Sequence, residues 1–318
     1  MQSTRIPYKT DDYGNPIYAR VSWSTATQSP RPIALIYHGG GLMVGSSEMI
    51  PKPQTEYRCS KGFLVVAPNY RLVPQVSGRQ AFADAVYAYD WTTTDLPKLL
   101  QAEHSLEIDS AQIVAMGHSS GGTLALHIAS CRSLKAATAF YPSLFLADPT
   151  TSMHRPTTAP PFGLMPDFTP TKEDSASIEP AGLQVSEAPL AIPGSIPQPR
   201  NKWQMHVIKH GQWPQTAQPD GDYAAMDPMT RVSARWPPVM IVQGEMDDVP
   251  GGGLELAERA EREMRAAGVR EVVLEVVPGE RHMFDLSPTV GTVDTGPKWE
   301  AVVRGLEWLK RHVSVKYD

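Results

Sequence analysis

The stretch that decides the fold is QIVAMGHSSGG, residues 112–122. It begins as an apolar run typical of a buried strand, and a helical pattern of small and apolar residues follows it up to Cys131. Between them, Gly117 and Gly121 flank Ser119. A strand, a tight turn with a central serine and a helix form a nucleophile elbow, in which glycines avoid clashes between strand and helix. The motif predicts an exposed Ser119 hydroxyl at a helix N-terminus, where the helix dipole favours developing negative charge.

A glycine run, HGGG at residues 38–41, ends a second apolar run. Acyl transfer to a serine passes through a tetrahedral oxyanion, which backbone N–H groups stabilise. Consecutive glycines let the main chain approach the reacting carbonyl with no side chain in the way. We predict an oxyanion hole formed by the N–H groups of Gly40 and Gly41, with Gly39 as a further candidate, and by that of Ser120. An ordinary glycine-rich turn after a strand is the alternative.

A serine at neutral pH needs a general base, and the base needs an orienting carboxylate. His282 follows a β-rich segment, so it lies in a strand-end loop that can reach the elbow. The carboxylate is expected after another apolar run, where a Gly-x-x-Asp pattern favours Asp247 over its neighbours Asp248 and Glu245. The predicted catalytic residues therefore occur in the order Ser119, Asp247, His282.

The chain resembles the hormone-sensitive-lipase-like branch of the α/β-hydrolases, the fold-3 esterase group. The order of the three residues is that of the fold. Residues 69–75, NYRLVPQ, resemble the group's Tyr-Arg-Leu-Ala-Pro-Glu segment, and residues 82–85, FADA, with Trp91 resemble the segment that follows it. The resemblance covers about residues 32–145 and 237–314, and it implies a carboxylesterase-like serine hydrolase.

The chain departs from that group at two places. Members commonly carry Asp or Glu before the nucleophile, where this chain has His118. They also tend to have a longer N-terminal arm, whereas about 30 residues precede the oxyanion strand here. His118 either supports the catalytic residues or fills the variable position of the elbow. These departures leave the fold and the triad intact and the substrate class open.

Predicted strands and helices alternate along the chain, which is typical of a mostly parallel, doubly wound sheet, here of about eight strands. Active-site groups gather at the carboxyl ends of the strands in such sheets. Strands are expected near 5–9, 16–24, 32–37, 63–68, 112–116, 137–141, 239–243 and 271–277, and helices near 48–60, 79–102, 120–131, 252–267 and 297–313. We expect residues 1–144 and 237–318 to form an α/β-hydrolase core.

Residues 145–236 interrupt the alternation. They contain 14 of the 30 prolines and are rich in aromatic residues and methionine, too apolar for a disordered linker and too proline-rich for long helices. We expect this segment to be an inserted cap that covers the elbow and supplies walls of a substrate pocket. The candidate pocket residues are Leu42, His118, Phe162, Trp203 and Trp213.

The bulk composition excludes several classes of function. A net charge of −5 without a basic cluster gives no indication of nucleic-acid binding, and no apolar stretch approaches membrane-spanning length. The N-terminus lacks an apolar signal core, and Cys59 and Cys131 are read as reduced thiols in separate helices, so a cytoplasmic protein is expected. A metal site is not expected, because the closest candidate, His206 with His210, lacks a third ligand.

These patterns predict a serine carboxylic-ester hydrolase that acts on a small to medium, largely apolar ester and requires neither cofactor nor metal. One alternative is a thioester or lactone hydrolase, or an acyltransferase, of a biosynthetic pathway that uses the same triad. A non-catalytic ligand receptor on this fold typically lacks a triad member, and an aryl-formamidase carries an aromatic residue in place of Leu42. The acyl and alcohol groups and the oligomeric state stay open.

Overall fold

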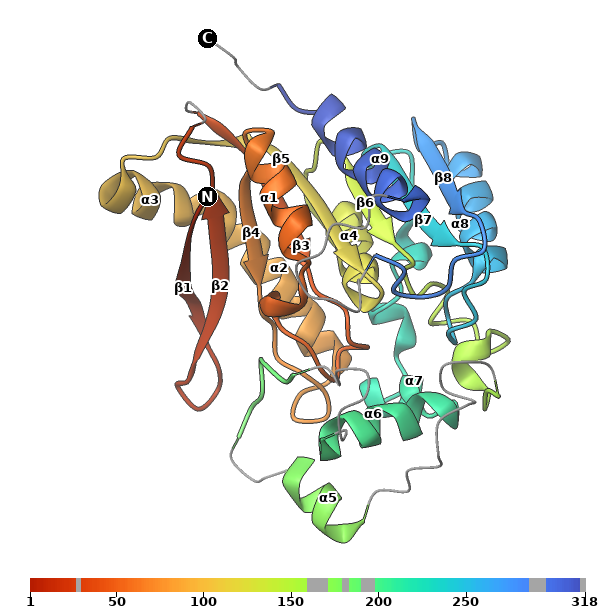
Figure 1. The fold of residues 1–318 in the computed structure, drawn as a ribbon. Coiled ribbons are helices and arrows are strands. Elements are labelled where there is room, and N and C mark those ends of the chain that lie inside the picture. The colour runs from red at the N-terminus through yellow and green to blue at the C-terminus, as the bar shows by residue number, and fades with distance from the viewer. Residues whose placement is uncertain (27–29, 159–170, 179–182, 190–197, 286–295, 315–318) are drawn as a thin grey trace.

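Among the residues that the structure describes, eight strands form one sheet in the order β1-β2-β4-β3-β5-β6-β7-β8 (Figure 1). In this computed structural model, β3 to β8 are parallel, while β2 is antiparallel to β4 and β1 to β2. All residues are described except 27–29, 159–170, 179–182, 190–197, 286–295 and 315–318. The strands are β1 Gln2–Thr10, β2 Pro16–Trp23, β3 Arg31–Tyr37, β4 Leu64–Pro68, β5 Ile108–His118, β6 Ala137–Phe140, β7 Val239–Gly244 and β8 Val272–Val277.

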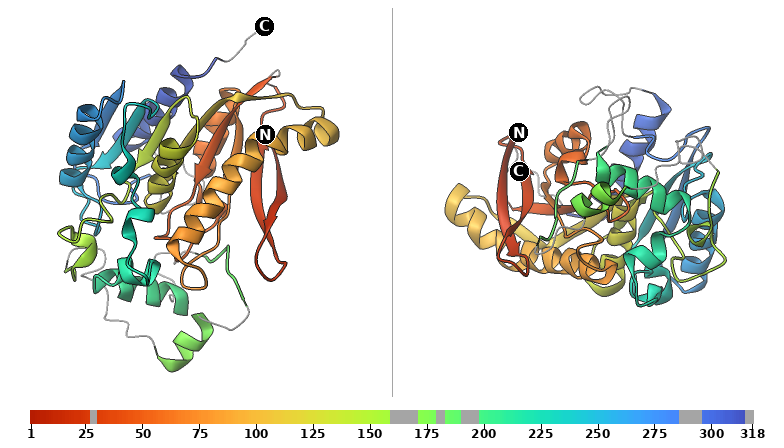
Figure 2. Two further views of the ribbon diagram at one scale, coloured as in Figure 1. Left: turned by 180° about the vertical axis from the view of Figure 1, so that it is seen from behind. Right: turned by 90° about the horizontal axis from the view of Figure 1, so that it is seen from below.

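Helices cover both faces of the sheet because its central strands are apolar on both sides. In β5, Ile113 and Ala115 face one hydrophobic cluster, and Val114 and Met116 face the other. Helices α1 and α9 pack on the second of these faces, and α2, α3, α4 and α8 pack on the first (Figures 1 and 2). Their bounds are α1 Lys52–Ser60, α2 Gly78–Thr94, α3 Leu96–His104, α4 Ser120–Cys131, α8 Leu254–Ala266 and α9 Pro297–Arg311.

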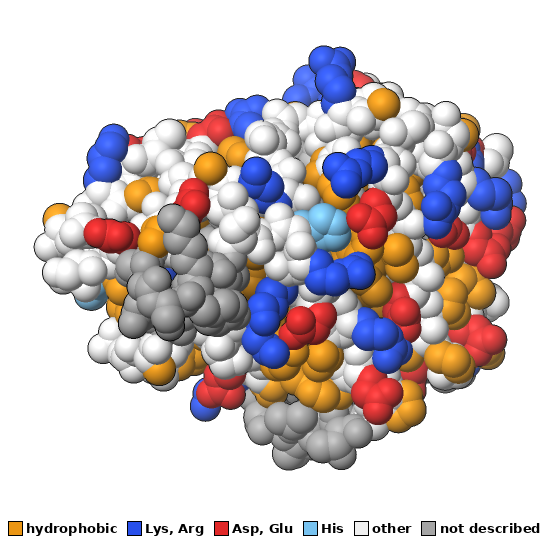
Figure 3. Space-filling model, turned by 90° about the horizontal axis from the view of Figure 1, so that it is seen from above, with side chains coloured by type: hydrophobic (Ala, Val, Ile, Leu, Met, Phe, Trp, Pro, Cys, Tyr) orange, Lys and Arg blue, Asp and Glu red, His pale blue; other side chains and the backbone are white. Residues whose placement is uncertain are grey.

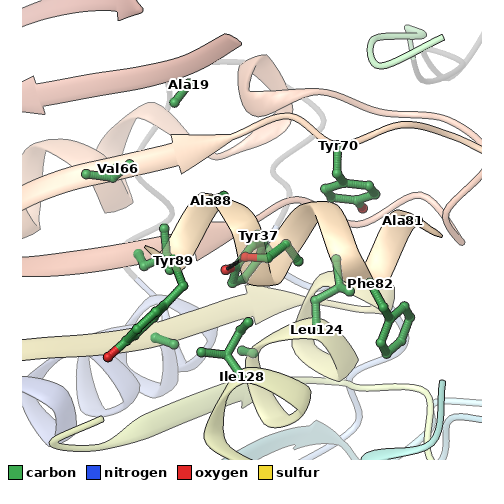
Figure 4. Close-up of a cluster of buried hydrophobic side chains, with 14 of the residues drawn as sticks. Ala19, Tyr37, Val66, Tyr70, Ala81, Phe82, Ala88, Tyr89, Leu124 and Ile128 are labelled. Carbon is green, nitrogen blue, oxygen red and sulfur yellow. Dashed lines mark hydrogen bonds between the residues drawn. The ribbon is translucent and has the colours of Figure 1, made fainter. Parts of the chain in front are cut away.

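The core that supports the serine elbow lies between β3, α2 and α4. Phe82 of α2 and Leu124 and Ile128 of α4 belong to one buried cluster with Tyr37 of β3 (Figure 4). The Tyr37 hydroxyl, fully buried, donates to the carbonyl of Ala85 at 2.8 Å. This packing fixes the position of α4, whose first turn follows Ser119.

A buried ion pair joins the loop after β4 to α2. Arg71 donates from Nε and Nη2 to both carboxylate oxygens of Asp84, at 2.7 and 2.8 Å. The side chain of Asp84 is fully buried, so two hydrogen bonds in fork geometry are needed to offset its desolvation. The two segments that carry the sequence resemblance, 69–75 and 82–85, are thus bound directly to each other.

The helix expected over residues 79–102 is in fact two helices, α2 and α3, so that prediction was wrong. Asp95 separates them, and Pro97 lies in the first turn of α3. Because proline has no N–H group, it cannot continue the hydrogen-bond ladder of α2, but it fits a new helix start.

In the described parts of the chain between β6 and β7 the helices are short, and they lie across one end of the sheet (Figure 2). They are η2 Ser152–His154, α5 Lys172–Ile178, α6 Pro199–Lys209, α7 Trp213–Ala217, η4 Tyr223–Ala225 and η5 Pro228–Arg231. Two of their side chains bind the loop after β3: Gln204 donates to the carbonyl of Gly40 at 2.9 Å, and Trp213 donates to that of Gly41 at 2.8 Å. The inserted segment is therefore attached to the glycine run.

The opposite end of the molecule carries basic and acidic side chains next to one another (Figure 3). The view shows no continuous area of one sign, in keeping with the small net charge of −5. In the part of the chain that the structure describes, no helix is long and apolar enough to cross a membrane. Both cysteines are free thiols there, Cys59 buried and Cys131 exposed.

Candidate active site

Ser119 lies in a sharp turn between β5 and α4 with φ 54° and ψ −124°, a conformation that non-glycine residues rarely adopt. The flanking glycines make this turn possible. A Cβ at Gly117 would lie 2.1 Å from the carbonyl oxygen of Gly121, and one at Gly121 would lie 2.2 Å from that of Tyr37. No side chain fits at either position, so both must be glycine, as the sequence motif predicts.

The structure brings together Ser119, His282 and Asp247, which the sequence places far apart. His282 Nε2 lies 2.9 Å from Ser119 Oγ, and His282 Nδ1 lies 2.8 Å from Asp247 Oδ2. A carboxylate only accepts hydrogen bonds, so Nδ1 carries the proton and Nε2 accepts from the serine hydroxyl. The imidazole is therefore oriented to remove the proton of Ser119.

Asp247 is held by more than the histidine. Gln243 donates to its Oδ2 at 2.7 Å, and the N–H of Val249 donates to its Oδ1 at 3.1 Å. Burial raises the pKa of Asp247, but the charge of His282 and these hydrogen bonds outweigh it and lower the pKa below its usual range. Asp247 stays ionised at neutral pH.

The two alternative carboxylates point elsewhere. Asp248 accepts a hydrogen bond from Arg281 at 2.7 Å, and Glu245 accepts from the N–H of Gly279 at 2.8 Å. The structure thus distinguishes Asp247 from Asp248 and Glu245 by contact with His282. Gln243, which the sequence analysis missed, is the one polar side chain of the otherwise apolar strand β7, a signal that could have found it.

The glycine run lies against the elbow. A Cβ at Gly39 would lie 2.8 Å from the carbonyl oxygen of His118, and Gly40 and Gly41 have φ of +113° and +64°. Among the described residues, the N–H groups of Gly39, Gly40 and Gly41 have no hydrogen-bond acceptor. Three free donors next to Ser119 match what an oxyanion requires.

His38 holds the glycine run in place. Its Nδ1 donates to the carbonyl of Gly39 at 2.7 Å, and its ring stacks on Tyr70 with centroids 4.3 Å apart. Tyr70 in turn donates to the carbonyl of His38 at 2.8 Å. Burial lowers the pKa of His38 to about 4, with the bond to Gly39 acting weakly against it. His38 is therefore neutral at physiological pH.

A cavity opens above Ser119. Of the predicted pocket residues, His118 and Trp213 line it. Leu42 is buried beside a smaller neighbouring cavity, and Trp203 packs, partly buried, against the hydrophobic core. Phe162 lies outside the described residues. The walls that the sequence analysis did not find are mainly apolar: Met49, Ile50, Met153, Ile208, Val249, Pro250 and Met283.

A buried polar cluster lies beneath the cavity and was also missed. Asp285, whose side chain is fully buried, accepts hydrogen bonds from Tyr141, Gln54 and His118. Burial acts to raise the pKa of Asp285, but His118 and these hydrogen bonds lower it. Tyr141 also presents its ring to His282, with centroids 4.7 Å apart. Asp285 follows His282 by three residues, yet nothing in the sequence indicates its partners.

Metal ligands are not grouped in the described parts of the chain: no three His, Cys, Asp or Glu side chains are placed to hold an ion. His206 of α6 contacts His210, the residue directly after this helix, with ring centroids 4.4 Å apart.

Residues 34–175 match the sequence model of the alpha/beta hydrolase fold family. Solved structures with this fold include a protein of unknown function from Staphylococcus aureus, with TM-score 0.70 and 19% identity, covering 97% of this chain and 98% of that one. Another is a butyrate-bound esterase from Thermogutta terrifontis, with TM-score 0.63 and 19% identity, covering 99% and 96%. The predicted fold class is confirmed; at these identities, the solved structures show the fold alone.

The chain is also similar to parts of much longer fungal proteins. It is 30% identical over 89% of its length to the non-reducing polyketide synthase adrD of Penicillium rubens, and 31% identical over 91% of its length to mapC' of Penicillium brevicompactum. It is 29% identical over 91% of its length to ausA of Aspergillus calidoustus. The chain spans 12%, 14% and 13% of the length of these relatives.

The lowered pKa of His38 makes stability depend on pH. Its pKa rises from about 4 in the folded chain to the ordinary 6.5 on unfolding, so its contribution is complete above pH 6.5 and is lost as the pH falls toward 4. His38→Asn keeps a donor for the Gly39 carbonyl but does not titrate. Between pH 7 and 4.5, the wild type is expected to lose about 2 kcal/mol more unfolding free energy than this variant. Urea denaturation of both proteins at both pH values measures the unfolding free energies. Equal losses in the wild type and the variant would contradict the prediction.

Proposed function

We propose that this chain, which belongs to the α/β-hydrolase family, is a serine hydrolase that cleaves an ester-type acyl bond through an acyl-enzyme at Ser119. One observation carries the proposal: Ser119 Oγ, His282 and Asp247 form a continuous hydrogen-bonded chain at the base of a cavity. This is the arrangement that activates a serine for acyl transfer.

In the proposed acylation, His282 Nε2 removes the proton of Ser119 as Oγ attacks the carbonyl carbon of the substrate. Asp247 keeps the proton of His282 on Nδ1 and stabilises the imidazolium that forms. The negative charge moves to the carbonyl oxygen, where the N–H groups of Gly40, Gly41 and Ser120, with Gly39 as a further candidate, would donate to it. His282 then gives its proton to the leaving group as the tetrahedral intermediate collapses.

Deacylation repeats the same steps with water. His282 removes a proton from the water molecule as its oxygen attacks the acyl carbon, and it returns the proton to Ser119 Oγ when the acid leaves. Since His282 lies between a carboxylate and the serine, with its side chain 8% exposed, the imidazolium is stabilised where solvent screens little. No step needs a group beyond the substrate, water and these side chains.

Residues 145–236 act in this proposal as the cap that determines the substrate. Met153, Ile208 and Trp213 from this segment line the cavity, while the reacting groups come from the strand ends. Apolar walls favour a largely apolar acyl or alcohol group. Residues 1–144 and 237–318 then form the catalytic core.

A second candidate function is acyl release from, or transfer within, a biosynthetic assembly, with a thioester in place of the ester. The similarity to polyketide synthases favours it, because it extends over 89–91% of the chain, whereas the family model ends at residue 175. Biosynthetic acyl groups are commonly held on carrier thiols, and the same serine chemistry cleaves both bonds. Comparing kcat/KM for matched oxoesters and N-acetylcysteamine thioesters of one acid distinguishes the two candidates.

The proposed mechanism predicts that Ser119→Ala folds normally and loses roughly 10⁴-fold or more in kcat. The hydroxyl faces a cavity and contributes little to packing. A fluorophosphonate is expected to label Ser119, as identified by mass spectrometry of the peptide, and to leave the variant unlabelled. Turnover of p-nitrophenyl esters near the wild-type rate by a folded Ser119→Ala protein would contradict the mechanism.

The choice of carboxylate is tested by a matched pair of neighbours. Asp247→Asn is expected to lower kcat by roughly 10³-fold or more, because an amide no longer fixes the histidine tautomer or balances its charge. Asp248→Asn removes the charge that pairs with the exposed Arg281 and is expected to change kcat less than about threefold. Steady-state kinetics of the two variants gives the comparison. A larger loss of kcat in Asp248→Asn would show that Asp248, and not Asp247, orients His282.

The cap is tested at Trp213, with Trp203 as the control outside the cavity. Trp213→Ala is expected to shift relative kcat/KM among p-nitrophenyl esters of different chain length by tenfold or more. Trp213→Phe loses the hydrogen bond to Gly41 but keeps an aromatic ring in the cavity wall, so it is expected to change the relative values less than Trp213→Ala does. Trp203→Ala is expected to leave the relative values unchanged. If Trp213→Ala scales every ester equally, the cap affects access or stability and does not select the substrate.

A further inference from the structure

A second pairing of histidine with a buried carboxylate lies in the same cavity as Ser119. His118 precedes the serine in the chain, and its Nε2 lies 3.1 Å from Asp285 Oδ2 and 3.0 Å from Gln54 Oε1. The proposed acyl-transfer steps use neither His118 nor Asp285. Burying a histidine with a carboxylate costs free energy of folding, because two polar groups must be desolvated.

The partners of His118 determine its tautomer. Gln54 donates from its Nε2 to Asp285 Oδ2 at 2.5 Å, so its Oε1 is the acceptor that faces the histidine. Both neighbours of His118 Nε2 therefore only accept hydrogen bonds, and Nε2 must carry the proton. In the neutral imidazole, Nδ1 then holds a lone pair and can only accept.

That lone pair has no partner among the described residues. Nδ1 of His118 makes no hydrogen bond to a described residue and is not fully buried. The residue is 5% exposed and lines the cavity. A bound molecule that fills the cavity displaces water from this acceptor, so a donor on that molecule is needed to pair it.

The ring of His118 is held rigidly. It stacks on Phe140 with centroids 5.2 Å apart, and Asp285 is itself fixed by Tyr141 and Gln54. A fixed acceptor surrounded by apolar walls selects by hydrogen bonding, because a substrate without the matching donor leaves it unpaired. Ser143 also lines the cavity and carries a hydroxyl, so it is the matched control.

We infer that His118 accepts a hydrogen bond from a hydroxyl group of the acyl moiety, so that the substrate class is a hydroxyl-bearing acyl ester or thioester. This inference rests on the proposed function, since the acyl group must be attached through Ser119. His118 is thus a specificity-determining residue, and Asp285 and Gln54 are positioning residues that act through it.

The test uses pairs of p-nitrophenyl esters that differ by one hydroxyl: benzoate against 2-, 3- and 4-hydroxybenzoate, and butyrate against 3-hydroxybutyrate. For the wild type, at least one hydroxylated ester is expected to have about tenfold higher kcat/KM than its parent, after subtraction of spontaneous hydrolysis. His118→Gln places an amide N–H where Nε2 was, so it preserves the bond to Asp285 while removing Nδ1. In this variant the preference is expected to fall below about threefold.

His118→Phe is a second variant, which retains the stacking on Phe140 but has neither nitrogen. Ser143→Ala is expected to retain the wild-type preference. Thermal melting and fluorophosphonate labelling of Ser119 establish that each variant is folded and has a reactive serine. A wild type that hydrolyses the parent esters without preferring any hydroxylated ester overturns the inference alone, as does a preference that survives in His118→Gln or is lost in Ser143→Ala. Absence of labelling and turnover in the wild type overturns the proposed function as well.

Discussion

The arrangement of the site depends on how closely three backbone segments approach one another at Ser119. The ends of β3 and β5 and the first turn of α4 are in contact through main-chain atoms, so that a Cβ at Gly121 would lie 2.2 Å from the carbonyl oxygen of Tyr37. Gly39 also lies close to β5, since a Cβ there would lie 2.8 Å from the carbonyl oxygen of His118. Because no side chains separate these segments, the free N–H groups of the glycine run lie beside the serine. The strained φ of Ser119 is the cost of this approach, and the packing of α4 on the sheet supports it.

Two histidines share the cavity but are oriented in opposite senses. His282 turns Nδ1 to Asp247 and leaves Nε2 for the serine, whereas His118 turns Nε2 to Asp285 and leaves Nδ1 unpaired. Tyr141 contacts both systems, since its hydroxyl donates to Asp285 and its ring packs against that of His282. Each carboxylate therefore has its own set of donors, and a proton on one imidazole is not shared with the other. This separation allows one histidine to serve the reaction and the other to serve recognition.

The features that the sequence predicted correctly are those that depend on a local sequence pattern. Alternating apolar runs indicated the sheet, and glycines around Ser119 indicated the elbow. Buried strands and tight turns each accept only a few residue types, so both leave a pattern in the sequence. Gly-x-x-Asp likewise indicated the aspartate that contacts His282. The partners of Asp285 could not be predicted, because Gln54, His118 and Tyr141 come from three different elements and follow no spacing rule. For the same reason Trp213 and Trp203, both aromatic and in the insertion, could not be told apart.

The family model and the similarity to polyketide synthases cover different parts of the site. The family model covers residues 34–175, which contain the glycine run and Ser119 but end before Ile208 and Trp213 of the cavity wall. Similarity to the polyketide synthases covers 89–91% of the chain and so necessarily includes most of residues 145–236. The match to the family model therefore bears on the reaction, while similarity across the insertion bears on the acyl group. A cavity with mainly apolar walls and one rigid, unpaired acceptor at His118 is suited to an acyl group that is apolar except for a hydroxyl. Hydrogen-bond selection of this kind discriminates more strongly than apolar walls alone, because a missing donor leaves a buried acceptor unpaired.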